Sequence, residues 1–104
     1  MQLNEILPAL AFELEQLFKN QGEPELAAQV SQLAIVDRCR CGDDFCSSFY
    51  TQPKPEGHDG PSHRCIDLDA AEGMLLVDVV ARKIFYVEVL NRADVRRKLL
   101  AALP

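Results

Sequence analysis

Apolar residues at the start of the chain recur at steps of three and four, which is the spacing of one face of a helix. This stripe covers residues 3–18. Asn4 is the predicted N-cap, unless Pro8 moves the start of the helix to a later position. Gly22 ends the helix, and Pro24 occupies the first position of a second, shorter apolar stripe. The sequence therefore predicts an N-terminal αα-hairpin.

Beyond Leu33 the pattern changes to the alternation typical of strands. Residues 33–41 are predicted to form one strand, residues 42–44 a Gly-Asp-Asp turn, and residues 45–51 the returning strand. The stretch 52–62 contains prolines and glycines, and it is predicted to be a loop that is mobile or used for binding.

The strongest strand signal lies in the second half of the chain. A short strand over residues 63–68 is predicted to precede two apolar strands, 74–80 and 84–90, which are joined by the loop 81–83. With this three-residue loop, six apolar side chains share one face of the hairpin. They are Leu75, Val77, Val79, Phe85, Val87 and Val89. The opposite face is half polar and includes Asp78 and Glu88.

A last helix is predicted after Asn91, a good N-cap residue. Val95 and Leu99 belong to its buried side, and its basic residues form the predicted solvent side. Those residues are Arg92, Arg96, Arg97 and Lys98. The element order α-α-β-β-β-β-β-α predicts a single α+β domain over residues 1–104. About five antiparallel strands, built from hairpins, form a sheet with the helices packed on one face.

Composition and net charge exclude some classes of function. The 104 residues carry a formal net charge of -5, which argues against nucleic acid as a direct ligand because phosphate binding needs a basic face. No apolar run approaches the roughly 20 residues that span a bilayer. The N-terminus has no signal-peptide pattern. We therefore expect a cytoplasmic protein without a membrane segment, whose cysteines are thiols or metal ligands.

Three of the four cysteines lie within eight residues, at Cys39, Cys41 and Cys46. With Cys65 or His63 as a fourth ligand they match the type and number of ligands in a tetrahedral zinc site. Their spacing is not that of the usual zinc ribbon or finger. The alternative interpretation is that they are small apolar residues of the core.

The register of the cysteine-bearing strands separates these interpretations. If the loop is Gly-Asp-Asp, Cys41 pairs with Phe45, and both Phe45 and Phe49 are buried at a gain of roughly 3 to 6 kcal/mol. If the loop has four residues, Cys41 pairs with Cys46 and the three thiols converge. Without metal the first register is predicted. A bound zinc ion, which contributes roughly 10 kcal/mol or more, reverses the preference.

Other groups are weaker candidates for chemistry. In the first register Cys46 shares a strand face with arginines, which makes it the candidate for a thiol-dependent enzyme. His58 and His63 flank a loop segment, and a histidine in such a loop is more often solvated than catalytic. Asp78 and Glu88 are diagonal across the last hairpin, where acidic residues usually serve solvation. No phosphate-binding glycine loop or nucleophile elbow occurs.

Two blocks of the chain support a resemblance. The first is Cys-Arg-Cys-Gly-Asp-Asp-Phe-Cys at 39–46, and the second is Val-Asp-Val-Val-x-x-Lys-Ile-x-Tyr-Val-Glu-Val-Leu-x-Arg at 77–92. Together they resemble small bacterial proteins of uncharacterised function. The resemblance implies a bacterial origin and an α+β fold, and it supplies no activity. In size, charge and class, with no motif behind the likeness, the chain is also similar to immunity proteins that neutralise bacterial toxins.

These observations favour a non-enzymatic, acidic protein-interaction module, with a toxin-neutralising immunity protein as its most concrete form. The expected partner is a protein, such as a basic toxin domain, and a homodimer is compatible with the half-apolar sheet face. The predicted partner-binding residues are Asp43, Asp44, Asp67, Asp69 and Glu72. No cofactor is expected under this hypothesis. The alternative is a small zinc-binding protein that uses the cysteines.

Overall fold

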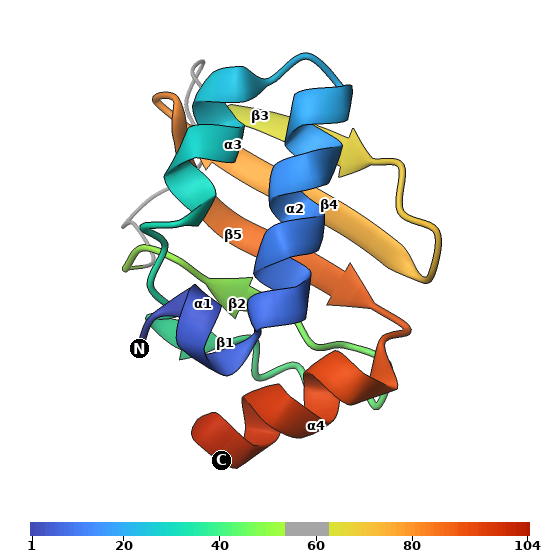
Figure 1. The fold of residues 1–104 in the computed structure, drawn as a ribbon. Coiled ribbons are helices and arrows are strands. Elements are labelled where there is room, and N and C mark those ends of the chain that lie inside the picture. The colour runs from blue at the N-terminus through green and yellow to red at the C-terminus, as the bar shows by residue number, and fades with distance from the viewer. Residues whose placement is uncertain (54–62) are drawn as a thin grey trace.

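The computed structural model describes residues 1–53 and 63–104, and it has the predicted α+β architecture. Five antiparallel strands form one sheet in the order β1-β2-β5-β4-β3. Helices α2 and α3 lie across one face of this sheet, and α4 lies beyond β1 (Figure 1). The elements are α1 (Leu3–Ile6), α2 (Pro8–Asn20), α3 (Pro24–Val30), β1 (Asp37–Arg38), β2 (Phe49–Tyr50), β3 (His63–Leu68), β4 (Met74–Val80), β5 (Lys83–Leu90) and α4 (Ala93–Ala102).

The N-terminal stripe forms two helices where one was predicted. The break is at Leu7, and Pro8 is the first residue of α2, where its missing N–H costs no hydrogen bond. Gln2, and not Asn4, is the N-cap of α1. The predicted end at Gly22, which has a φ of 77°, and the predicted start at Pro24 are both confirmed.

The core lies between α2, α3 and the covered face of the sheet. Phe18 and Leu14 of α2 are fully buried, as are Leu75, Val77 and Val87 of the sheet. The predicted apolar stripes of the helices and strands therefore meet in one cluster. Burial of each such side chain stabilises the fold by roughly 1.5 to 3 kcal/mol.

The apolar hairpin, β4 and β5, differs from its prediction at the turn. Its loop is the two-residue pair Ala81-Arg82, both with positive φ, and Val80 is the partner of Lys83. A bulge between Asp78 and Val79 then restores the predicted register, so that Val77 pairs with Val87. The correction concerns one residue: Ile84 is buried in place of Phe85, because the extra bulge residue shifts the side-chain alternation.

The cysteine hairpin, residues 37–50, adopts the register that was not predicted without metal. Asp37 pairs with Tyr50 and Arg38 with Phe49, and this register, continued, sets Cys41 opposite Cys46. Phe45 is consequently 51% exposed. Phe49 faces the core in both registers. The residue that pairs with Phe49 on the neighbouring strand points to the same face of the sheet. The rejected register would put the carboxylate of Asp37 there, whereas Arg38 reaches the carbonyl of Leu103 at 2.6 Å.

Helix α4 begins one residue later than predicted, with Arg92 and not Asn91 as its N-cap. The prediction that Arg92 faces solvent is wrong. Its side chain is 8% exposed and forms a bidentate ion pair with Glu13 of α2, with N–O distances of 2.9 and 2.5 Å. Arg92 Nε also donates to the carbonyl of Glu72 at 2.7 Å. This network fixes the start of α4 against α2 and the β3–β4 turn.

Candidate metal centre

The thiol cluster, Cys39, Cys41 and Cys46, is the group of potential metal ligands that the described residues bring together. The three Sγ atoms all lie within 4.8 Å of one another. Zinc binds thiolates at about 2.3 Å in tetrahedral geometry, which sets neighbouring sulfurs about 3.8 Å apart. The cluster therefore needs a contraction of about 1 Å or less to hold such an ion.

Local backbone geometry brings the three thiols together. Cys39 N–H donates to the carbonyl of Ser48 at 2.8 Å, which continues the ladder of β1 and β2 past Arg38. Gly42 turns the chain with a φ of 83°, a conformation that favours glycine. Cys46 N–H closes the turn on the carbonyl of Asp43 at 3.2 Å.

The surroundings of the thiols shift their pKa values in opposite directions. The backbone N–H of Asp43 lowers the pKa of Cys41, but Cys46, burial and Cys39 raise it more, to about 11. Burial raises the pKa of Cys46, yet hydrogen bonds from the side chain and backbone of Ser48, with those of the neighbouring thiols, bring it below its usual value. One thiolate is therefore favoured and further deprotonation is opposed, as expected for anions crowded together without a cation.

Ser48 is a supporting residue that the sequence did not reveal. Its Oγ accepts a hydrogen bond from Val89 N–H at 2.9 Å and lies 3.4 Å from Cys46 Sγ. The serine is 1% exposed, so its hydroxyl is held in place by β5. Outer groups of this kind orient metal ligands and tune their basicity.

A small cavity of about 20 Å³ adjoins the cluster. Helix α4 supplies one wall with Leu99 and Leu100, and two arginines, Arg38 and Arg96, also line it. Arg96 was predicted to face solvent, but its Nε is buried and has no hydrogen-bond partner within residues 1–53 and 63–104. Arg96 lies three residues before the buried Leu99, a spacing that puts the two on the same side of the helix, and this was the signal available in the sequence.

The fourth ligand predicted from the sequence is not at this site. Cys65 and His63 lie on β3, at the opposite edge of the sheet, with β4 and β5 between them and β2. Cys65 is exposed as a residue. Partial desolvation of its thiol and the neighbouring Asp78 carboxylate raise the pKa of that thiol. His63 Nε2 lies 3.4 Å from a carboxylate oxygen of Asp78. Cys65 and His63 are remote from the thiol cluster because of the order of the strands in the sheet, which the sequence pattern did not predict.

The predicted partner-binding residues are all exposed. Asp43 and Asp44 lie in the loop of the cysteine hairpin, and the other three lie on β3 or in the turn after it: Asp67, Asp69 and Glu72. Their role in binding a protein stays a prediction. His58 and most of the predicted loop 52–62 lie outside the described residues.

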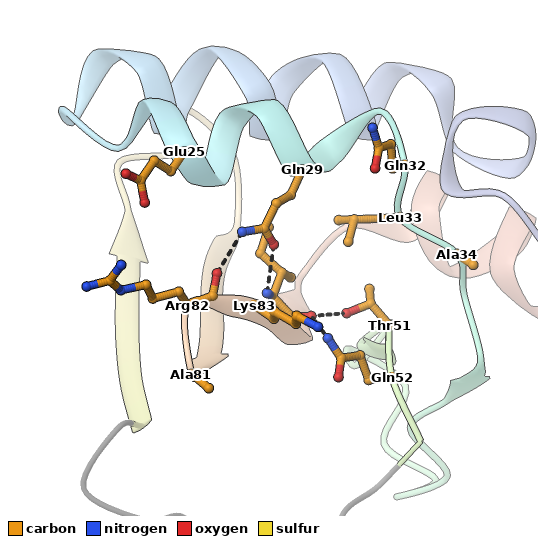
Figure 2. A pocket seen from close by; sticks show the side chains of 11 residues that line it. Glu25, Gln29, Gln32, Leu33, Ala34, Thr51, Gln52, Ala81, Arg82 and Lys83 are labelled. Carbon is orange, nitrogen blue, oxygen red and sulfur yellow. Dashed lines mark hydrogen bonds between the residues drawn. The ribbon is translucent and has the colours of Figure 1, made fainter.

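A larger cavity, of about 560 Å³, lies between α3 and the turn of the apolar hairpin (Figure 2). Gln29 spans it, donating to the carbonyl of Arg82 at 2.7 Å and accepting from Ile84 N–H at 3.0 Å. Thr51 Oγ1 donates to the carbonyl of Ile84 at 2.8 Å. These polar groups hold the turn against α3 and β2, and no cysteine or histidine is among the described lining residues.

None of the helices in the described ranges is both long and apolar enough to cross a bilayer. Comparisons of the chain with protein-family models, with curated proteins and with solved structures found no match.

Proposed function

We propose that this protein binds a zinc ion through the thiolates of Cys39, Cys41 and Cys46, and that the ion fixes the cysteine hairpin. The observation that carries the proposal is the convergence of the three Sγ atoms within 4.8 Å. Thiolate ligands select zinc and other soft ions over magnesium or calcium. The proposed function is structural, and it requires no reaction at the metal.

The hairpin register agrees with this proposal, and the position of Asp37 favours the same register independently of a metal. It leaves Phe45 half exposed, which forgoes transfer free energy of roughly 1.5 to 3 kcal/mol for a buried phenylalanine. In exchange it sets Cys41 opposite Cys46. This is the arrangement expected of a metal-bound hairpin.

The surroundings of the sulfurs also suit a metal ion. Backbone N–H groups of Asp43 and Ser48 donate to Cys41 and Cys46, each from two residues further along the chain. Such N–H donors stabilise the thiolate form that a metal requires. Cys41 is exposed while Cys39 and Cys46 are half-buried, so an ion has a route from solvent to the site.

The test is a zinc titration of the reduced protein in competition with a chromophoric chelator. We expect wild type to bind one zinc ion per chain. Cys41→Ser removes one ligand, and its affinity should fall by more than the roughly 100-fold that loss of an outer-shell partner costs. Cys65→Ser is the matched control, an exposed cysteine on β3, and it should bind as wild type does. Equal affinities for wild type and Cys41→Ser would refute the proposal.

A further inference from the structure

The thiol cluster brings free cysteines close enough for a covalent reaction with one another. The Sγ atoms of Cys39, Cys41 and Cys46 lie within 4.8 Å of one another, and all three are free thiols. A disulfide joins two sulfurs at about 2.0 Å, which side-chain rotation can reach only if the Cα atoms are about 4.4 to 6.8 Å apart. The backbone therefore decides which of the three pairs can form this bond.

Strand geometry separates the three pairs. Cys41 is opposite Cys46 when the register of β1 and β2 is continued, and opposite residues have Cα atoms about 4.5 to 5.5 Å apart. Cys39 is then diagonal to Cys46, at about 7 to 8 Å. Cys39 and Cys41 are two residues apart on one strand, at about 6.6 Å. The pair Cys41 and Cys46 is the one that lies well inside the range for a disulfide.

The interactions between the thiols agree with this choice. After the backbone N–H of Asp43, which lowers the pKa of Cys41, the largest effect on that pKa comes from Cys46, ahead of burial and of Cys39. The pKa of Cys46 responds first to burial and to Ser48, and then to Cys41 ahead of Cys39. Cys41 and Cys46 are therefore each other's main thiol neighbour.

A small oxidant can reach the pair from solvent. Cys41 is exposed and Cys46 is half-buried. The loop between them turns at Gly42, with a φ of 83°, and Cys46 N–H donates to the carbonyl of Asp43 at 3.2 Å. This turn holds the two ends of the loop together. Hydrogen peroxide suits such a position, because it is small and uncharged and needs no binding site of its own.

We propose that Cys41 and Cys46 form an oxidation site, at which hydrogen peroxide converts their two thiols to a disulfide. One sulfur attacks a peroxide oxygen, the O–O bond breaks, and a sulfenic acid and one water form. The other sulfur then displaces the hydroxyl group as a second water and forms the S–S bond. The two sulfurs together lose two electrons to the peroxide, and the two thiol protons leave in the waters.

This disulfide needs no metal, so the inference goes beyond the proposed function. The two functions nevertheless share Cys41 and Cys46. Formation of the disulfide leaves Cys39 as the one remaining thiol of the cluster, and a zinc ion bound there is released. A bound zinc ion in turn protects the thiols from peroxide. The oxidation state then decides whether a metal ion or a covalent bond closes the hairpin.

The experiment oxidises the reduced full-length protein with hydrogen peroxide, at low protein concentration and with a chelator present. Remaining thiols are alkylated, and the disulfide is located by mass spectrometry of peptides. Trypsin cleaves after Arg40, and an Asp-specific protease cleaves within the Asp43-Asp44 pair, so the three cysteines fall on separate peptides. We expect one link, between Cys41 and Cys46, with the other two of the four thiols alkylated.

Variants and denaturant test whether the fold selects this pair. Cys39→Ser is the matched control, because it removes the third thiol of the cluster and keeps the pair, and it should form the link at the wild-type rate. Cys41→Ser and Cys46→Ser should each lose the link. In concentrated urea, where no strand register exists, wild type should give a mixture of links. A native product that links Cys39, or the same mixture with and without urea, would overturn the inference.

Added zinc separates this inference from the proposed function. If only the metal-free cluster reacts, a free zinc concentration about 100 times Kd should slow formation of the link about 100-fold. A selective link whose rate zinc does not change would support the oxidation site and contradict the zinc site. A protein that binds one zinc ion but forms no link between Cys41 and Cys46 in its metal-free state would overturn the inference and leave the zinc function standing.

Discussion

The apolar hairpin and the cysteine hairpin lie side by side in one sheet, and different forces hold them. In the apolar hairpin, strands of seven and eight residues pair along their length, and Leu75, Val77 and Val87 are fully buried. The cysteine hairpin pairs over two residues on each strand, and its loop exposes Phe45 and Cys41. Packing is sufficient for the first hairpin, whereas the second has few packed groups near its loop.

This difference indicates which part of the protein a bound ligand would stabilise. β5 pairs with β4 on one side and with β2 on the other, so the apolar hairpin serves as the scaffold for the cysteine hairpin. Contacts with β5 fix the positions of Phe49 and Ser48. Residues 39–46, in contrast, extend beyond the paired residues of β1 and β2. A metal ion would stabilise this part of the hairpin, where hydrophobic packing is least.

The largest expected effect comes from damage to the scaffold. Leu75→Ala removes a fully buried side chain and should lower the free energy of unfolding by about 2 to 5 kcal/mol. The loss, measured by urea denaturation, should be similar with and without zinc. Leu76→Ala, at the half-buried neighbour on the other sheet face, should lose less. Equal losses for the two variants would contradict the assignment of Leu75 to the packed core, and a loss for Leu75→Ala that depended on zinc would contradict the contrast between the two hairpins.

An intermediate effect is expected from the metal on the cysteine hairpin alone. At a free zinc concentration about 100 times Kd, binding stabilises the bound form by about 2.7 kcal/mol, which slows amide exchange through local opening about 100-fold. We expect this at Cys39 N–H and Cys46 N–H, which bond to Ser48 and Asp43. Hydrogen exchange read by NMR checks it. Equal slowing in Cys41→Ser would show that the ion acts elsewhere.

The smallest expected effect is at Phe45. Because its side chain is 51% exposed, Phe45→Ser should change the free energy of unfolding by about 0.5 kcal/mol or less and leave zinc affinity unchanged. Thermal unfolding and the chelator competition measure the two quantities. A loss of more than about 2 kcal/mol would instead fit a core position, and the register with Phe45 buried would then apply in solution.

Local signals in the sequence predicted most of the fold. The apolar stripes, Pro24 and the alternation of the last two strands gave the elements and the buried set. Local signals were insufficient at the turn of the apolar hairpin, where Ala81 and Arg82 adopt positive φ although neither is a residue type that favours it. They were also insufficient for Arg92, because its partner Glu13 is 79 residues away.

The candidate site was predicted in part. The three hairpin cysteines are brought together as the metal hypothesis requires, but the transfer free energy of Phe45 pointed to the wrong register. That estimate omitted Asp37, which the other register would turn toward the core. Cys65 was misplaced because pairing partners of distant strands are not encoded in periodicity. The contribution of Arg96 depends on where α4 lies, which is a tertiary feature.

The position of β5 in the sheet also sets the order in which the site is completed during synthesis. The cysteines occupy residues 39–46, but the strand that supports Ser48 spans Lys83–Leu90, and the helix that walls the cavity spans Ala93–Ala102. A chain leaving the ribosome therefore exposes all three thiols until residues 83–102 have emerged. The cysteines are therefore free thiols on an incompletely folded chain before β5 and α4 complete the site around them.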